Sequence, residues 1–416
     1  MGSRPRRWHG GDRRQAFVKD AQQQFDALIE RCVDVVSKED LIARLRLGRP
    51  LRVKLGIDPS GPMLHLGHAV VLRKLRQFQD LGHEAILIVG DFTAEIGDPT
   101  GLSAARKPRT RDEIRADMQS YAEQAALILD IKRTKVVYNG DWLSPLTFAD
   151  VINLSSKITV ARMLERDDFT KRFQSGSPIG LHEFVYPLTV AYDSVMVKAD
   201  VELGGTEQLF NLLMGRRLQE ESGQPAQICM TLPILEGTDG VQRMGKSLSN
   251  YIPLRDAPSQ MFGKVMSIPD ALIGRYYRLA TDLPAGEIER IERELSKEST
   301  SLRDAKFRLA GEIVRLYHGK PAAQKAQEHF EKTVVRKELP EDVPTFTLAA
   351  DGESLTVAKL LVSVGWASSN REAQRLVEQG AIKIDGTRVD DVRHAEKSWD
   401  GKVLQKGNHQ FIRLRG

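Results

Sequence analysis

Between about residues 45 and 250, short apolar runs alternate with stretches in which apolar residues recur at helical spacing. The runs at 51–57, 85–89 and 135–138 predict buried strands, and the periodic stretches at 68–81 and 112–129 predict helices. Continuously apolar strands separated by helices are typical of a parallel sheet with helices on both faces. The pattern therefore predicts an α/β fold, in which ligands bind beyond the carboxyl ends of the strands.

The rest of the chain has a different pattern. Residues 255–336 are expected to be wholly helical, and the segment 338–353, with two prolines and five acidic residues, is expected to be a linker. After it, helices at 357–364 and 370–379 and a strand with a turn at 380–386 predict a small α+β module. The predicted domains are a basic, disordered extension at 1–20, an α/β domain at 21–250 with a helical insertion at about 125–200, a helical domain at 251–337, the linker, and a C-terminal module at 354–416.

Composition narrows the possible functions. The net charge is +5, and most of it belongs to residues 354–416, where eleven Lys and Arg stand against seven Asp and Glu. This distribution favours a nucleic-acid partner. The two cysteines, Cys32 and Cys229, lack the spacing of a disulfide framework or zinc site and fit a reducing cytoplasm. No long apolar run occurs and the first 14 residues carry five arginines without an apolar core, so neither a membrane span nor a signal peptide is expected.

Two motifs indicate nucleotide chemistry. The sequence His65-Leu-Gly-His68 stands where a predicted strand and its turn lead into a helix. Free N–H groups and the helix dipole favour anions at such a place, so two imidazoles there predict phosphate binding. The polar stretch Arg243-Met-Gly-Lys246-Ser247 would supply cations to the same phosphates. Each motif alone has an ordinary explanation, as a capping histidine or a solvated lysine, but together they favour nucleotidyl transfer.

Two further glycine-containing segments follow predicted strands. The segment 97–101 comes shortly after the run at 85–89, and the segment 204–208 follows an expected strand at 199–203. Each contains glycine, which permits close backbone approach, and a carboxylate or amide that suits an amine, a ribose or a carboxylate. Both segments are therefore candidate parts of a binding site.

With these motifs in this order, the chain resembles the bacterial tyrosyl-tRNA synthetases, which are class I aminoacyl-tRNA synthetases. The signature motifs are 65–68 and 243–247, and the tyrosine-specific features are 97–101, 186–193 and 204–211. The resemblance covers about residues 20–416, and the C-terminal module is similar to the αL RNA-binding motif. It implies a Rossmann-like catalytic domain, a dimerisation insertion, an anticodon-side helical domain and a cytoplasmic homodimer.

The resemblance also implies two reactions at one site. The carboxylate of tyrosine attacks the α-phosphate of ATP bound to Mg²⁺, which gives tyrosyl-adenylate and pyrophosphate. The terminal ribose of tRNA(Tyr) then takes the tyrosyl group. Neither step needs a side-chain nucleophile or a metal site on the protein, so catalysis would come from positioning and from cations that face the phosphates.

The resemblance carries roles onto individual residues around the nucleotide. Arg243 stands where a lysine is usual, which keeps the charge and changes its shape. Arg106 would belong to a loop that closes over pyrophosphate. The implied catalytic residues are His65, His68, Arg106, Arg243 and Lys246. The implied ATP-binding residues are Ser60, Gly67, Gly205, Glu207, Met244 and Lys246.

The tyrosine pocket and the tRNA contacts are implied in the same way. Asp193 would accept the phenol O–H, a contact whose discrimination against phenylalanine, roughly 10⁵-fold, is an established example for this family. Asp98 and Tyr186 would hold the ammonium group. The implied tyrosine-binding residues are Lys54, Asp98, Tyr186, Val190, Asp193 and Gln208. The implied tRNA-binding residues are Arg371, Arg375 and Lys383.

Three positions depart from the family pattern. Val190 replaces a glutamine that helps to bind the amino group, Glu207 replaces an aspartate, and Lys54 replaces a tyrosine found in some members. Because valine can neither donate nor accept a hydrogen bond, Val190 predicts weaker or altered amino-acid selection.

Three other functions share part of this pattern. A tryptophanyl-tRNA synthetase shares both signatures but lacks this C-terminal module. A nucleotidyltransferase that makes a small cofactor shares the histidine motif but needs no RNA-binding domain. A non-catalytic RNA-binding protein would not need to keep His65, His68, Asp98 and Lys246.

Overall fold

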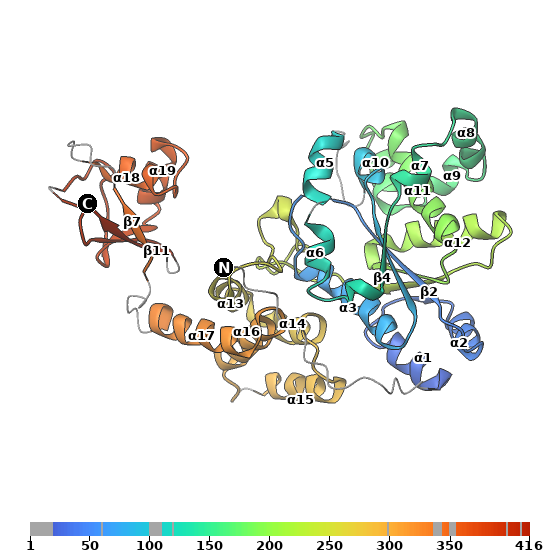
Figure 1. Ribbon diagram of the computed structural model, residues 1–416, viewed down its shortest axis with the longest axis horizontal. Coiled ribbons are helices and arrows are strands. Elements are labelled where there is room, and N and C mark those ends of the chain that lie inside the picture. Colours follow the sequence, from blue (N-terminus) through green and yellow to red (C-terminus); the bar gives the residue numbers. More distant parts are fainter. Residues whose placement is uncertain are drawn as a thin grey trace. The chain divides into compact units, whose positions relative to one another are not determined.

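The computed structural model describes residues 20–59, 61–99, 110–118, 120–297, 299–335, 343–348, 355–396, 398–407 and 410–416. Ser60 and Arg106 lie outside these residues, as do nearly all of the basic extension and most of the predicted linker. The described residues form two compact units (Figure 1). One contains the residues up to Arg255 together with Ile268–Thr300, and the other contains Asp256–Ser267 and Ser301–Gly416.

The first unit is built on a six-stranded sheet in the order β1-β6-β5-β2-β3-β4. Five of its strands are parallel and β1 is antiparallel to β6, so the predicted parallel sheet is confirmed. The short edge strand β1 was not predicted from the sequence. The strands are β1 (Val35–Val36), β2 (Arg52–Ile57), β3 (Glu84–Val89), β4 (Thr134–Tyr138), β5 (Val201–Gly205) and β6 (Ile228–Leu232).

Helices of the first unit precede, connect and follow these strands. The expected helix at 112–129 is two shorter helices, α5 and α6. The helices before β4 are α1 (Ala21–Ile29), α2 (Lys38–Arg46), α3 (Leu66–Asp80), α4 (Thr93–Ile96), α5 (Arg111–Met118) and α6 (Tyr121–Ala125). Those after β4 are α7 (Gly140–Leu143), α8 (Phe148–Ser156), α9 (Val160–Met163), α10 (Asp167–Gln174), α11 (Leu181–Val197), α12 (Leu209–Glu221), α14 (Ile273–Ala280) and α15 (Ala285–Leu295).

The segment between β4 and β5 carries five of these helices and has a core of its own. Leu154 of α8 and Met163 of α9 pack with Leu188 and Ala191 of α11 and with Met214 of α12. Helix α12 also contacts β5 and β6. The insertion is therefore anchored to the sheet through α11 and α12.

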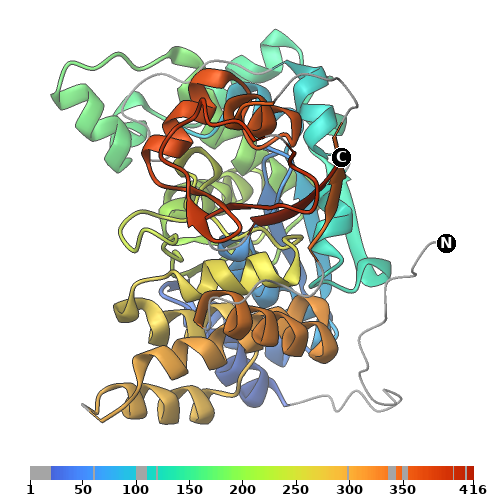
Figure 2. The same cartoon turned by 90° about the vertical axis from the view of Figure 1, so that its left-hand side faces the viewer.

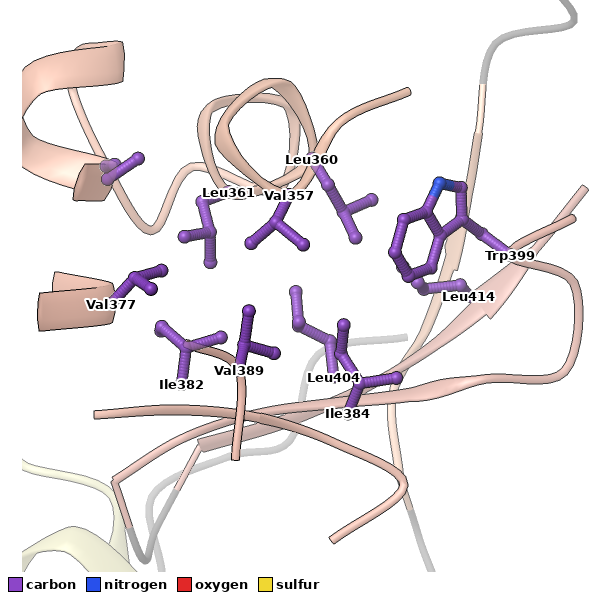
Figure 3. Close-up of a cluster of buried hydrophobic side chains, with 12 residues drawn as sticks. Val357, Leu360, Leu361, Val377, Ile382, Ile384, Val389, Trp399, Leu404 and Leu414 are labelled. Carbon is purple, nitrogen blue, oxygen red and sulfur yellow. The ribbon is translucent and has the colours of Figure 1, made fainter. Parts of the chain in front are cut away.

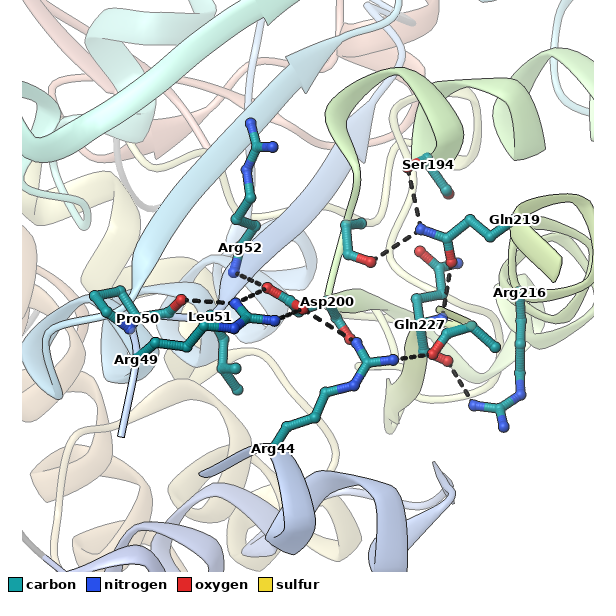
Figure 4. A network of polar contacts seen from close by, with 12 residues as sticks. Arg44, Arg49, Pro50, Leu51, Arg52, Ser194, Asp200, Arg216, Gln219 and Gln227 are labelled. Carbon is teal, nitrogen blue, oxygen red and sulfur yellow. Dashed lines mark hydrogen bonds and ion pairs between the residues drawn. The ribbon is translucent and has the colours of Figure 1, made fainter. Parts of the chain in front are cut away.

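A network of charged groups fixes the amino ends of the central strands (Figure 4). Asp200, directly before β5, accepts hydrogen bonds from Arg49 at 2.7 Å and from the backbone N–H of Arg52 at 2.9 Å. Arg44 of α2 contacts the same carboxylate at 3.3 Å. Burial raises the pKa of Asp200, but these partners outweigh it and lower the pKa overall. Ion pairs thus stabilise the amino ends of these strands. The candidate functional residues lie at the opposite, carboxyl ends.

The second unit contains α-helices, a short π-helical segment, η5 (Glu331–Val335), and the C-terminal module. Helices α16 (Leu302–His318) and α17 (Lys320–Phe330) lie side by side (Figures 1 and 2). They pack on α13 (Pro258–Met266), where the ring centroid of Phe262 lies 5.1 Å from Phe307 and 5.3 Å from Phe330. The predicted helical region at 251–337 is therefore shared between the two units.

The C-terminal module has a five-stranded sheet in the order β7-β11-β10-β8-β9. Strand β7 lies within residues 338–353, so this part of the predicted linker is instead paired with β11 in the sheet. Two helices cover an apolar core that includes Leu360, Leu361, Val377, Leu404 and Trp399 (Figure 3). The elements are β7 (Thr345–Thr347), α18 (Val357–Ser363), α19 (Asn370–Glu378), β8 (Ile382–Ile384), β9 (Thr387–Arg388), β10 (Val403–Lys406) and β11 (Gln410–Arg415). Across both units, no helix within the described residues is both long enough and apolar enough to cross a membrane.

Candidate active site

The two signature histidines lie at the start of α3, which follows the carboxyl end of β2. Helix α3 begins at Leu66, earlier than the predicted residue 68, because His65 is extended and serves as the N-cap. The backbone N–H of His65 donates to Nδ1 of His68 at 3.2 Å, and the two ring centroids are 3.9 Å apart. This bond leaves the proton of His68 on Nε2.

Both histidines are held in the neutral form. Burial, followed by the nearby charges of His68 and Lys246, lowers the pKa of His65 well below its usual value. Burial and Lys246 lower the pKa of His68 to about 3. Nδ1 of His65 is buried without a hydrogen-bond partner among the described residues. At pH 7 the pair therefore offers neutral hydrogen-bonding groups at a helix N-terminus.

The second signature lies in a loop that is closed by Asn250. Its side chain accepts from the backbone N–H of Gly245 at 2.8 Å and donates to the carbonyl of Arg243 at 3.1 Å and to Asp239 at 2.7 Å. The residues that follow the loop pair with the start of α3, since the N–H of Leu66 donates to the carbonyl of Ile252. The two signatures are thus brought together by backbone pairing.

Lys246, in the short 3-10 turn η3 (Lys246–Leu248), reaches the turn before α3. Its Nζ donates to the carbonyl of Gly61 at 2.7 Å and to the hydroxyl of Tyr121 at 2.9 Å. A Cβ at Gly67 would lie 3.0 Å from the His65 ring and 3.6 Å from Met244, so glycine there permits the close approach of the two motifs. Arg243 is exposed in the same loop, and the side chain of Ser247 is outside the described part of the structure.

Asp193 of α11 is buried at the same edge of the sheet and is surrounded by polar side chains. Trp142 Nε1 donates to its Oδ1 at 2.8 Å, and Asn139 Nδ2 donates to its Oδ2 at 3.2 Å. Burial raises the pKa of Asp193 to about 7, although Lys54 and these two donors oppose the shift. The carboxylate is therefore fixed in orientation and titrates near neutral pH.

Lys54 lies next to this carboxylate and is completely buried. Its Nζ forms an ion pair with Glu202 at 2.9 Å and donates to Ser194 at 2.8 Å and to the carbonyl of Val190 at 3.0 Å. The backbone carbonyl of Val190 thus helps to hold Lys54 in place. The side chain of Val190, which stands where the family usually has a glutamine, is apolar.

Asp98 lies in a ring of hydrogen bonds. Its Oδ2 accepts from Gln208 Nε2 at 2.8 Å and its Oδ1 accepts from Arg166 Nη2 at 3.1 Å. Asn211 closes the ring, because it donates to Gln208 Oε1 at 2.7 Å and accepts from Arg166 Nη1 at 3.4 Å.

Tyr186, predicted to lie beside Asp98, donates its O–H to Asp58 at 2.9 Å. Asp58 also accepts from Thr93 at 2.7 Å, and Thr93 accepts from Asn139 at 3.0 Å. Because Asn139 also donates to Asp193, these bonds connect Tyr186 of the predicted ammonium site with Asp193. Burial, followed by Asp58 and Asp98, raises the pKa of Tyr186 well above its usual value, so the hydroxyl stays protonated.

Glu207, in the 3-10 turn η2 (Thr206–Gln208) after β5, approaches the backbone of Gly205 closely. A Cβ at Gly205 would lie 2.3 Å from Oε2 of Glu207, a distance that no side chain tolerates. That oxygen is buried without a hydrogen-bond partner among the described residues, and burial raises the pKa of Glu207. Glycine and an unmatched acceptor therefore coincide where the resemblance implies a ribose contact.

The three predicted tRNA-binding residues are in the C-terminal module. Arg371 and Arg375 are exposed on α19, and Lys383 is half-buried in β8. Arg375 lies 3.8 Å from Glu372 on its own helix, a loose pair. In the described part of the chain, no three His, Cys, Asp or Glu side chains gather in a way that would hold a metal ion.

The sequence alone did not single out several residues of this site. Asp58 directly follows β2 and Asn139 directly follows β4, so their places after strand ends were a usable signal. Tyr121, Trp142 and Arg166 reach the site from α6, α7 and the N-cap of α10. Apolar periodicity predicts that such helices exist, but it does not predict which parts of the fold they contact. Their roles became visible only with the fold.

Comparison with known proteins agrees with these features. A family model described as tRNA synthetases class I (W and Y) matches residues 46–335, and one described as a tyrosine–tRNA ligase SYY-like C-terminal domain matches residues 335–413. The tyrosine–tRNA ligase of Thermotoga maritima is 53% identical over 395 residues, which make up 95% of this chain and 98% of that protein. The tyrosine–tRNA ligase of Moorella thermoacetica is 50% identical over 400 residues, 95% of this chain and 96% of that protein.

Solved structures share the fold at lower identity. A C-terminally truncated mitochondrial tyrosyl-tRNA synthetase from Aspergillus nidulans superposes with a TM-score of 0.62 at 24% identity, over 76% of this chain and 97% of that chain. A tyrosyl-tRNA synthetase complexed with L-tyrosine from Archaeoglobus fulgidus superposes with a TM-score of 0.61 at 21% identity, over 74% of this chain and 100% of that chain. These likenesses bear on the architecture of the catalytic part.

Proposed function

The chain belongs to the class I tRNA synthetases, in the tyrosine–tRNA ligase family, and we propose that it activates tyrosine with ATP and transfers the tyrosyl group to tRNA(Tyr). The resemblance read from the sequence is thereby confirmed. The observation that carries the substrate assignment is the buried Asp193 carboxylate, held by Trp142 and Asn139 at the sheet edge that also bears His65 and His68.

In the first step, a carboxylate oxygen of tyrosine attacks the α-phosphorus of ATP, and the bond to pyrophosphate breaks. Because His68 carries its proton on Nε2, it donates a neutral hydrogen bond to a phosphate oxygen. Lys246 and Arg243 provide the positive charge that faces the departing pyrophosphate. Mg²⁺ enters with the phosphates of ATP, as is usual where protein ligands are few.

In the second step, a hydroxyl of the terminal ribose of tRNA attacks the tyrosyl carbonyl, and AMP leaves. Glu207 accepts a hydrogen bond from a hydroxyl of the adenylate ribose. Its buried Oε2, which has no partner among the described residues, and the lack of a side chain at Gly205 support this role. Tyrosine is held by Asp193 at its phenol and by Asp98, Tyr186 and Gln208 at its other end.

Val190 makes ammonium binding depend on fewer groups. With valine there, the ammonium group relies on Asp98 and Tyr186, whose O–H already points to Asp58 and leaves its lone pairs for the substrate. A Val190→Gln variant should lower the KM for tyrosine in the exchange reaction. If its KM stays at the wild-type value, altered selection at this position is wrong.

The protein acts as a homodimer whose interface is the insertion. Large apolar side chains are exposed on its helices: Phe148 at 81%, Ile152 at 56%, Val160 at 64%, Phe173 at 65% and Leu181 at 83%. Exposed apolar groups gathered in one segment mark an interaction surface, and symmetric association covers such a surface with a second copy of itself. Sedimentation of Leu181→Glu should show monomers, whereas Val241→Glu, equally exposed at 83% but outside the insertion, should stay dimeric.

The C-terminal module positions tRNA through its phosphates. Arg371 and Arg375 are exposed at one side of α19, and contacts between such side chains and phosphates hold RNA without reading its sequence.

The thiols of Cys32 and Cys229 are both free of disulfide bonds, which suits the reducing cytoplasm in which we place the reaction.

Charging of purified tRNA tests the complete reaction. The protein should attach labelled tyrosine to tRNA(Tyr) in the presence of ATP and Mg²⁺ and leave tRNA(Trp) uncharged with tryptophan. Charging of tRNA(Trp) would favour the tryptophanyl alternative. Binding of tRNA without charging by any amino acid would instead indicate a non-catalytic RNA-binding protein.

A further inference from the structure

A buried arginine outside the implied substrate contacts lies at the centre of the ammonium end of the site. Arg166 is 5% exposed and caps α10, within the helical insertion. Besides Asp98, its guanidinium contacts Asp168 at 2.8 Å through Nε, and its Cζ lies 5.3 Å from the centroid of the Phe169 ring. One side chain thus connects α10 and α12 with the loop after α4.

The ring around Asp98 leaves its carboxylate little freedom. Arg166 takes one oxygen and Gln208 the other, and Asn211 ties those two partners together. Arg166 and Gln208 thus set the orientation of the Asp98 carboxylate before the substrate arrives.

Arg166 also separates two negative charges. Asp98 and Asp168 both contact its guanidinium. The second oxygen of Asp168 is buried and has no hydrogen-bond partner within the described residues. Without the guanidinium, the two partly buried carboxylates would repel each other, and one would take up a proton or turn away. Either change removes the arrangement that an ammonium group needs.

We propose that Arg166 is a positioning residue for amino-group recognition: it holds the Asp98 carboxylate oriented toward the ammonium of tyrosine. The role rests on the proposed function, because it concerns the same substrate. It gains weight from Val190, since the ammonium site lacks the glutamine that would share the task. Because Arg166 contacts Asp98, its effect should fall on the amino group and spare the phenol.

The test compares three ligands that differ only at the polar end. Tyrosine has both groups, tyramine keeps the ammonium and lacks the carboxylate, and 3-(4-hydroxyphenyl)propanoate keeps the carboxylate and lacks the ammonium. Their dissociation constants are measured by calorimetry with the full chain and with Arg166→Met. The constants for tyrosine and tyramine should rise about tenfold or more, the loss expected for a charged hydrogen bond, while the constant for the propanoate stays within about twofold.

A matched control separates positioning from general stability. Arg172 of α10 is 3% exposed and forms a buried ion pair with Glu183, but no described contact links it to Asp98. Arg172→Met should destabilise the protein comparably and change none of the three constants by more than about twofold. Should Arg166→Met not fold, Arg166→Lys, which keeps the charge, is measured with the same ligands and should show a smaller loss confined to tyrosine and tyramine.

The outcomes are distinct. Equal weakening of all three ligands, or of none, overturns the role of Arg166. Tighter binding of tyramine in Arg166→Met also overturns it, because charge repulsion would then outweigh positioning. If the wild-type chain binds none of the three ligands, the proposed tyrosine site fails, and with it any role of Arg166 in amino-group recognition.

Discussion

The site at the sheet edge and the C-terminal module place their polar groups in opposite ways. At the sheet edge, Lys54, Asp193 and Arg166 are buried and hydrogen-bonded to one another or to further polar groups. In the module, the interior around Leu360 and Leu404 is apolar (Figure 3), and Arg371 and Arg375 are exposed.

This difference shows how each region can respond to change. A buried polar group that loses its partner costs far more than an exposed one, because water cannot replace the lost bond. Substitutions at the sheet edge should therefore act strongly and on particular chemical groups of the substrate. Substitutions of the exposed arginines should act modestly and leave activation of the amino acid alone.

The largest effect is expected for Lys246→Ala. Removal of the cation that faces pyrophosphate should lower the kcat of tyrosine-dependent pyrophosphate exchange about 10²–10³-fold, the range seen when one donor to a developing charge is lost. The KM for tyrosine should change little. Gln242→Ala, exposed in the same loop, is the control and should keep the wild-type rate. A loss below about fivefold in Lys246→Ala would exclude the lysine from the reaction.

Asp193→Asn should have the next largest effect. The amide keeps the size of the side chain but brings an NH₂ group against Nδ2 of Asn139 and removes the charge that accepts the phenol O–H. Tyrosine kcat/KM should fall about 100-fold. Phenylalanine, tested with the same variant, should change little, so discrimination between the two amino acids should collapse. Equal losses for both would mean that Asp193 has a structural role only.

A smaller effect is expected when Arg371→Ala and Arg375→Ala are combined. Aminoacylation kcat/KM for tRNA should fall about tenfold. The slope of log kcat/KM against log salt concentration should become less negative by about one to two. Pyrophosphate exchange should be unchanged. Gln374→Ala, on the same exposed helix, should affect neither reaction. A loss of exchange activity in the double variant would contradict the division of labour between the two regions.

The smallest effect is a pH dependence of tyrosine binding. The pKa of Asp193 is raised to about 7, so the carboxylate that accepts the phenol proton is lost as the pH falls through 7. The KM for tyrosine should therefore rise about tenfold between pH 8 and pH 6 and level off above pH 8. In Asp193→Asn the profile should be flat. A wild-type KM that is constant from pH 6 to pH 8 would show that Asp193 does not govern binding in this range.

The sequence predicted the two regions unequally. In the first unit, apolar runs gave the parallel strands, and the place of His65–His68 after β2 gave a phosphate site. In the module, periodicity gave α18, α19 and β8. Strands β7, β9, β10 and β11 were not predicted, and the pairing of β7 with β11 joins residues distant in the chain.

The site was less predictable than the fold for a physical reason. Motifs report residues that touch a ligand, but Arg166, Trp142 and Asn139 act on other side chains through bonds formed only in the folded protein. Asn139 follows a strand end and could have been suspected from its position. Arg166 stands in a short helical insertion, where no local pattern indicates what its guanidinium will meet.

Amino-acid-dependent exchange of labelled pyrophosphate into ATP, measured with tyrosine, phenylalanine and tryptophan, tests the account most directly. It isolates the activation step at the sheet edge from everything that the C-terminal module does. We predict strong exchange with tyrosine and little with the other two. Exchange with tryptophan in preference to tyrosine, or exchange with none of them, would contradict it.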